Sequence, residues 1–326
     1  MLTRRVLLEG IAAGAIVSSA RAAMPDGALA TADVHPAGYP TVAAVAWIDE
    51  QLQKEFAGAL SLSSYPSGQL GTEKDTLELT RLGAIAVTRV NSSVLNNLIP
   101  ATRILSLPYV FDSTEHMRRA FDASFGDEIL AACNARGMLG LAIYDSGSRN
   151  FYNTRRPVAT PADLHGLKLR VPQSDIFIES VAALGASPTP LAYGSVFSAL
   201  QTHLIDGAEN NWPSFYSSRH FETATYWSES AHAYAPDMLL MSKRVADALP
   251  AEQREFLLHT ARQSVGLMRE RWDDTVRVSR EAVLAAGVSV NEVEAAAFRR
   301  AAQPLVDRYL ADPEIERLYA KLRSFA

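Results

Sequence analysis

The chain has 326 residues, of which 48% are hydrophobic and 21% charged, and its formal charge is −5. This length and composition favour two compact units with sizeable cores. They argue against nucleic-acid binding, because no block of lysines and arginines supplies the basic surface that a phosphate backbone requires. A single cysteine, Cys133, rules out an internal disulfide and is expected to be a small core residue.

The first 22 residues have the features of an export signal. Arg4 and Arg5 precede an apolar run from about Ile11 to Val17, and the following small residues fit an A-x-A cleavage pattern ending at Ala22. A retained membrane anchor is the weaker interpretation, since the run is shorter than the ~20 residues that span a bilayer. The paired arginines also resemble a twin-arginine signal. We therefore expect cleavage near Ala22 and a mature protein free in the periplasm.

Helical and strand patterns alternate through the first half of the mature chain. Val42, Val45 and Ile48 recur at helical spacing, while LSLSSYP alternates as a half-buried strand does. Thr72 with Asp75 three residues later predicts a helix start. The expected helices are 39–57, 72–83 and 116–137, and strands are expected at 60–66 and 84–91; the segment 138–153 is expected to begin as a buried strand and to run into a polar loop. This order predicts an α/β unit with a mostly parallel sheet.

The same pattern restarts at about Pro157 and predicts a second α/β unit. Strands are expected at LKLRVP, SPTPLA and IDGAEN, with helices over 175–185 and 193–204 between them. A much longer helix is expected over 250–287, because no proline interrupts it and Gly266 is its only internal glycine. Such a helix is about 54 Å long and should cross both units. Two helices broken near Gly266 are the alternative.

The usual catalytic and cofactor motifs are missing from the sequence. It contains no G-x-S-x-G, H-E-x-x-H, C-x-x-C, G-x-G-x-x-G or G-x-x-x-x-G-K pattern. The seven histidines are scattered, and none pair at i, i+4. Neither a metal nor a cofactor is therefore expected.

Two arginines lie where expected strands end. Arg170 follows the apolar LKL, and Arg149 lies just beyond LGLAIY. Ligands of open α/β sheets bind outside the carboxyl ends of strands, and a guanidinium matches a carboxylate with two parallel hydrogen bonds. This pattern predicts an anionic ligand. Alternatively, each is a surface arginine paired with a local acid.

The stretch LIDGAENNWPSF places two amides at the end of another strand of the second unit. Asn210 and Asn211 could face the same cleft as Arg170, and each offers donors and an acceptor suited to hydroxyls and a carboxylate. Alternatively, these residues serve only the turn before Trp212 and Pro213.

The sequence also resembles a known family. GLKLRVPQSD, the segment from ALGASPTPLAYGS to DMLLMSK, DVHPAGYPT, SGQLGTEKDTLEL and YDSGSRNFYNT are similar to motifs of the solute-binding proteins of tripartite ATP-independent periplasmic (TRAP) transporters, of the C4-dicarboxylate-binding type. The resemblance covers essentially the whole mature chain. It implies a hinged two-lobed receptor that closes on an organic acid and delivers it to a membrane permease. The implied division is lobe I at 23–147 plus 236–275 and lobe II at 148–235 plus 276–326.

The resemblance also implies ligand-binding residues. An arginine in the position of Arg170 forms the main salt bridge to the ligand carboxylate in this family, and the residue matching Asn210 assists. Arg149 matches a second arginine that is often used. From the first lobe, the positions that commonly face the cleft match His35, Glu73 and Arg89.

Acids and amides among these positions favour a sugar acid over a C4-dicarboxylate. A dicarboxylate needs two cationic anchors, whereas a sugar acid needs one carboxylate clamp plus partners for its hydroxyls. The candidate partners are Glu73, Gln173, Asp175, Asn210 and Asn211. Asp175 is alternatively an acid that stabilises a helix N-terminus. The pairing of DVHPAGYPT with QSD and AENNWPS is similar to the subgroup that binds hexuronates such as glucuronate or galacturonate.

Two other functions stay open at this point. An exported lyase or lactonase could use the same arginine with Tyr152, Tyr193 or Glu73 as acid or base. A receptor read by a sensor protein instead of a permease would need only the same closed surface. A monomer is the default expectation.

Overall fold

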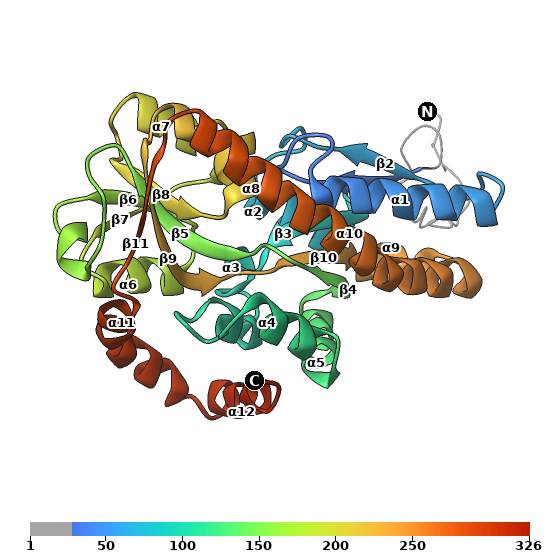
Figure 1. The fold of residues 1–326 in the computed structure, drawn as a ribbon. Helices are drawn as coiled ribbons and strands as arrows, with labels where there is room; N and C mark the ends of the chain where they lie inside the picture. The colour runs from blue at the N-terminus through green and yellow to red at the C-terminus, as the bar shows by residue number, and fades with distance from the viewer. Residues whose placement is uncertain (1–27) are drawn as a thin grey trace, which may run out of the picture.

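The computed structural model describes residues 28–326, so the expected signal peptide at 1–22 lies outside the described residues. The chain forms two α/β lobes joined side by side (Figure 1), and this confirms the expected two-lobed fold. We define lobe I as the sheet of order β2-β1-β3-β10-β4 with the helices packed on it, and lobe II as the sheet of order β11-β9-β5-β8-β6-β7 with its helices. No helix within residues 28–326 is both long and apolar enough to cross a bilayer.

The expected strands lie close to their predicted places, but β5, β9, β10 and β11 were not predicted as strands. The bounds of the strands are β1 Leu29–Ala32, β2 Leu62–Tyr65, β3 Val87–Asn91, β4 Met138–Tyr144, β5 Ser148–Asn153, β6 Lys168–Val171, β7 Ser187–Pro190, β8 Gly207–Asn210, β9 Tyr226–Tyr234, β10 Asp237–Ser242 and β11 Ser289–Glu292. The segment 148–153, expected as a polar loop, is strand β5. Each sheet mixes parallel and antiparallel pairs, because β5 and β10 run against their neighbours. The expectation of mostly parallel sheets was therefore wrong for these strands.

The helices include the expected capped and long ones. The α-helices are α1 Pro40–Glu55, α2 Glu73–Leu82, α3 Ser92–Leu95, α4 Thr114–Phe121, α5 Ser124–Ala132, α6 Asp175–Ala183, α7 Val196–Gln201, α8 Trp212–Ser217, α9 Lys243–Ala248, α10 Ala251–Ala285, α11 Ala295–Leu310 and α12 Pro313–Arg323, and the 3-10 helices are η1 Pro100–Ser106, η2 Cys133–Arg136, η3 Pro161–Leu164, η4 Tyr193–Ser195 and η5 His220–Glu222. Thr72 and Asp75 form the predicted capping box of α2. The helix predicted over 116–137 is instead two helices, because the chain turns at 122–123 and Gly126 packs against the backbone of Phe121.

Helix α10 is continuous through Gly266 and packs on both lobes, as predicted for the long helix. Its Leu257 and Met268 belong to a core cluster that contains strands of lobe I, whereas Val283 belongs to a cluster of lobe II. Residues 145–147, which join β4 to β5, and residues 235–236, which join β9 to β10, also cross between the lobes. These two segments and α10 form the hinge region, and a further crossing lies near the C-terminus.

The C-terminal helix α12 packs on lobe I. Ile315, Leu318 and Leu322 are buried in the cluster that also contains Met238 and Leu240 of β10. The division implied by the sequence resemblance assigned residues 276–326 as a whole to lobe II. The chain therefore returns to lobe I after α11, which packs on lobe II through Phe298.

Candidate functional site

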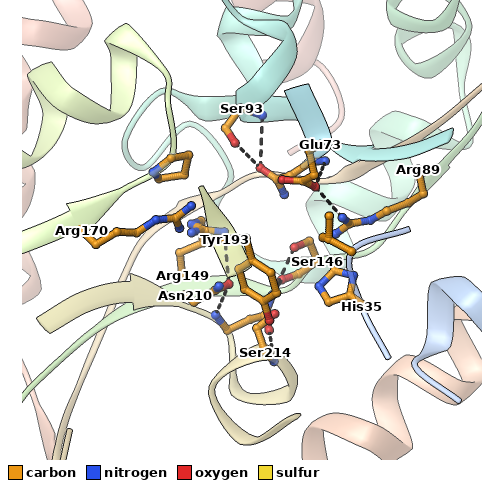
Figure 2. A pocket seen from close by; sticks show the side chains of 14 residues that line it. His35, Glu73, Arg89, Ser93, Ser146, Arg149, Arg170, Tyr193, Asn210 and Ser214 are labelled. Atoms are coloured by element: carbon orange, nitrogen blue, oxygen red, sulfur yellow. Dashed lines mark hydrogen bonds and ion pairs between the residues drawn. The ribbon is translucent and has the colours of Figure 1, made fainter. Parts of the chain in front are cut away.

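A cavity lies between the two lobes and is lined by polar side chains from both (Figure 2); its empty space is about 350 Å³, including space open to solvent. It forms where β1, β3, β6 and β8 end, as the carboxyl-end rule for such sheets predicts. Its lining residues are Val34, His35, Glu73, Arg89, Asn91, Ser93, Ser146, Arg149, Arg170, Pro172, Tyr193, Asn210, Asn211 and Ser214. Seven of the nine residues predicted from the sequence are in this set.

Among the arginines that line the cavity, Arg170 has no carboxylate partner within residues 28–326. The residue is only 4% exposed. It lies in β6 between Leu169 and Val171, whose side chains enter the core on the opposite face of the strand. Its Nε donates to the backbone oxygen of Leu191 at 2.9 Å. Within residues 28–326 its guanidinium makes no ion pair with a carboxylate, and its remaining N–H groups point into the cavity (Figure 2). Burial, together with the neighbouring Arg149, lowers the pKa of Arg170.

Arg149 lies beside Arg170 but is neutralised by Glu209. Its Nη2 donates to Glu209 Oε1 at 2.8 Å, its Nε donates to Oε2 of the same carboxylate, and its Nη1 donates to Asn210 Oδ1 at 3.3 Å. Burial opposes the charged form, yet Glu209 raises the pKa of Arg149. The sequence alternative of pairing with a local acid holds for Arg149, although the pair is buried and not on the surface. Lobe II therefore offers one uncompensated positive charge.

The two asparagines have different roles. The Oδ1 atom of Asn210 accepts from the backbone N–H of Asn211 at 2.9 Å, while its Nδ2 has no partner among the described residues and can donate into the cavity. Asn211 caps α8, accepting from the backbone N–H of Ser214 at 2.8 Å and donating to the backbone oxygen of Ser146 at 2.8 Å. The turn alternative thus accounts for the side chain of Asn211 and not for that of Asn210.

Lobe I presents a wall with excess negative charge. Arg89 donates to Glu73 Oε1 at 2.6 Å and to Asp237 Oδ2 at 2.5 Å, and Asp33 lies 3.9 Å away. Burial opposes the charged guanidinium, but Asp237, Asp33 and Glu73 raise the pKa of Arg89. The Oε2 atom of Glu73 has no hydrogen-bond partner within residues 28–326, so it can accept from a hydroxyl. Its carboxylate is held in place because Oε1 also accepts from the backbone N–H of Asn91 at 2.8 Å.

His35 lies on the same wall and touches the opposite lobe. Its Nδ1 lies 3.0 Å from Asp33 Oδ1, and its ring stacks on Tyr39 with centroids 3.8 Å apart. The ring of Tyr193, from lobe II, stands edge-on to His35 at 5.3 Å. Nearby, the Tyr39 hydroxyl lies 3.1 Å from Ser214 Oγ of lobe II. The lobes thus contact each other directly beside the cavity.

The remaining two predicted residues lie outside this cavity. Gln173 is exposed and lines an adjoining cavity that shares Glu73, Arg170 and Tyr193 with the first. Asp175 is exposed at the first position of α6 and lines neither cavity. Its position agrees with the alternative of an acid at a helix N-terminus.

Seven lining residues were not predicted as ligand contacts: the apolar Val34 and Pro172, and the polar Asn91, Ser93, Ser146, Tyr193 and Ser214. Among the polar five, Asn91 and Ser93 come first in the chain. A signal for the first two was present, since VNSS places small polar residues directly after a strand. Ser146 and Ser214 give no such signal, because their positions depend on the hinge and on the start of α8. Tyr193 entered only as a possible acid or base, and burial raises the pKa of its hydroxyl.

Comparisons with known proteins agree on one family. The profile of DctP, described as bacterial extracellular solute-binding protein, family 7, matches residues 31–312. A TRAP periplasmic solute-binding protein of Bradyrhizobium sp. BTAi1, solved in complex with α/β-D-galacturonate, is 46% identical, covers 91% of this chain and 99% of its own, and superposes with a TM-score of 0.89. One of Chromohalobacter salexigens DSM 3043, solved with D-glucuronate, is 33% identical, with 91% and 100% covered and a TM-score of 0.89. A curated relative named solute-binding protein, also from C. salexigens, is 34% identical over 293 residues, which are 89% of this chain and 87% of the relative.

Proposed function

We propose that this chain, which belongs to family 7 of the bacterial extracellular solute-binding proteins, is a receptor for a hexuronate, with galacturonate as the first candidate. The observation that carries the proposal is the buried guanidinium of Arg170, which has no carboxylate partner in the described chain and faces a wall of hydroxyl acceptors. Two similar proteins that hold galacturonate are 45% and 46% identical, whereas two that hold glucuronate are 36% and 33% identical. This difference favours galacturonate.

In the proposed complex the ligand carboxylate engages Arg170 and the free amide of Asn210. Charge-assisted bidentate hydrogen bonds of this kind are about twice as strong as neutral ones. The sugar hydroxyls extend toward lobe I, where Glu73 Oε2 accepts from one of them and Arg89 holds Glu73 in place. Closure of the lobes then excludes water from the cavity by a hinge movement.

The charges in the cavity argue against a C4-dicarboxylate. Such a ligand needs a second available cation, but Arg149 is bound to Glu209 and Arg89 is surrounded by Glu73 and Asp237. A second ligand carboxylate would therefore meet acids on lobe I. A sugar acid with one carboxylate and several hydroxyls fits both walls.

Of the residues named for the enzyme alternative, the two tyrosines are poorly suited as acid or base, and Glu73 is assigned here to a ligand hydroxyl. Burial raises the pKa of both Tyr152 and Tyr193, which moves them further from proton transfer near neutral pH. The Tyr152 hydroxyl is also occupied, because it lies 2.8 Å from His220 Nδ1, and Tyr152 does not line the cavity. We therefore propose binding without turnover.

The remaining proposals concern location and partners. We propose that residues 1–22 direct export, that cleavage occurs near Ala22, and that a monomer delivers its ligand to TRAP membrane subunits. A sensor protein that reads the closed form is the alternative partner.

A ligand panel tests the function. Thermal shift and calorimetry with galacturonate, glucuronate, galactarate and succinate should give the tightest binding to a hexuronate, since a ligand of the native state raises its apparent stability. Galactarate is the matched control, because it adds a second carboxylate to the same carbon skeleton. Tighter binding of galactarate or succinate than of either uronate would overturn the proposal, and so would formation of product from the uronate during the incubation.

A further inference from the structure

Helices that connect the two lobes pack on both faces of the sheets. In β10, Leu239 and Met241 pack in the cluster that contains Leu257 and Met268 of α10. The alternate residues, Met238 and Leu240, pack on the opposite face with α12. Successive residues of a strand point to opposite faces of its sheet. Helices α10 and α12 therefore cover opposite faces of lobe I.

Lobe II shows the same division. Phe151 of β5 packs with Phe298 of α11, their ring centroids 6.2 Å apart, whereas its neighbour Tyr152 belongs to the cluster that contains Val283 of α10. One face of the two lobes is thus bridged by α10 and the other by α11 and α12. Figure 1 shows α10 crossing both lobes while α11 and α12 run below them from lobe II to α4 and α5.

The second connection is anchored firmly at both ends. On lobe II, Glu179 of α6 pairs with Arg308 and accepts from the Tyr309 hydroxyl at 2.9 Å. On lobe I, Glu128 pairs with Arg317 at 2.5 Å and with Lys321 at 2.8 Å. The apolar docking is stronger still, because each fully buried leucine or isoleucine of α12 contributes about 1.5–3 kcal/mol.

The link between these anchors has little slack. Only residues 311–312 separate α11 from α12. Two residues reach at most about 7 Å when fully extended. A tilt of one lobe toward the α10 face would have to stretch this link or pull α12 out of its core. A rotation within the plane of the sheets, about the hinge strands between the two straps, requires neither.

We propose that α11–α12 is a second strap which, together with α10 on the opposite face, confines the lobes to opening and closing within the plane of the sheets. The strap restricts the relative orientation of the two lobes in the open state to orientations from which they can close over the cavity. The unliganded protein then loses less conformational entropy when it closes on a ligand, and this strengthens binding. The affinity part of this inference rests on the proposed function, whereas the restriction of movement does not.

The test lengthens the link without disturbing either anchor. Two glycines are inserted between Ala311 and Asp312, and the control carries two glycines between Ala57 and Gly58, in an exposed turn within lobe I. Spin labels at the exposed positions Ala131 of lobe I and Gln201 of lobe II report the distribution of distances between the lobes. Without ligand, the strap insertion should broaden this distribution and the control should not. Calorimetry should show galacturonate binding weakened at least about threefold by the strap insertion alone.

A distribution as narrow as that of the parent protein would overturn the proposal. Failure of every uronate to bind the parent protein would refute the proposed function and leave the distance measurement to decide on the strap. Should the two-residue insertion prevent folding, a single glycine at the same place lengthens the link by about 3.5 Å and leaves both anchors unchanged. That variant should also broaden the distribution, and an unchanged width would count against the strap.

Discussion

Replacement of Arg170 by methionine should separate ligand binding from stability. Arg170 is 4% exposed and has no carboxylate partner within residues 28–326. An unpaired buried charge destabilises the unliganded protein, and replacing buried charges by apolar side chains of similar size is often neutral or stabilising by about 1–4 kcal/mol. Arg170→Met should therefore leave the unliganded protein at least as stable as the parent.

The same change should remove most of the binding energy. Loss of one partner of a buried, hydrogen-bonded charge pair costs about 2–5 kcal/mol. At about 1.4 kcal/mol per tenfold change, this weakens binding by roughly 30-fold to several thousand-fold. Calorimetry with galacturonate measures the affinity, and thermal unfolding without ligand measures the stability.

Arg149→Met is the matched control, since it removes a neighbouring guanidinium that has a partner. Glu209 is 0% exposed, so this variant leaves a buried carboxylate without its cation and should lose about 3–5 kcal/mol of stability. Parental affinity in Arg170→Met would refute the binding role. A loss of stability in Arg170→Met as large as in Arg149→Met would refute the claim that Arg170 lacks a protein partner.

Three further changes test other parts of the structure. Glu73→Gln should weaken galacturonate binding by about 1.5–3 kcal/mol in calorimetry, because the sugar hydroxyl then loses a hydrogen bond to a charged carboxylate oxygen. Unchanged affinity would show that Glu73 does not contact the ligand. Asp145→Asn should lower the free energy of unfolding in urea by roughly 1–3 kcal/mol, since this buried hinge carboxylate pairs with Arg118 and Arg269, which are 23% and 17% exposed. A change below about 0.5 kcal/mol would contradict this. Burial, with a smaller effect of Arg170, lowers the pKa of His220 from 6.5 to about 3. Between these values the unfolded chain binds more protons, so moving from pH 7 to pH 5 should cost about 2 kcal/mol of stability in the parent and clearly less in His220→Gln; equal losses in both would contradict this reasoning.

Local patterns predicted most of the fold where polar and apolar residues follow one period. The cap of α2 and the whole of α10 were predicted because their signals lie within a few residues of each other. Strand β5 was missed because SRNFYN contains several polar residues, and one of them, Arg149, lines the cavity. A strand that contributes to a binding site loses the apolar pattern by which strands are recognised.

The site was predictable as far as chain order determines it. Arg170 and Asn210 follow strands whose carboxyl ends meet at one edge of the sheet, so their approach could be expected from the sequence. The pairing of Arg149 with Glu209 could not, because it depends on β5 lying antiparallel to β8, with Phe151 opposite Glu209. Sequence spacing gives no register between strands 60 residues apart. The same limit hid the return of α12 to lobe I.

The division of charge between the lobes also gives an order of events. Lobe II has one positive charge in excess at the cavity, whereas on lobe I Arg89 faces three carboxylates, those of Asp33, Glu73 and Asp237. A ligand carboxylate is therefore attracted to the open surface of lobe II and repelled by that of lobe I. We therefore expect capture on lobe II to come first and lobe I then to close on the hydroxyls. Entry in the reverse orientation would set like charges against each other in a closed, poorly solvated cavity, so the arrangement selects the direction of the ligand as well as its charge.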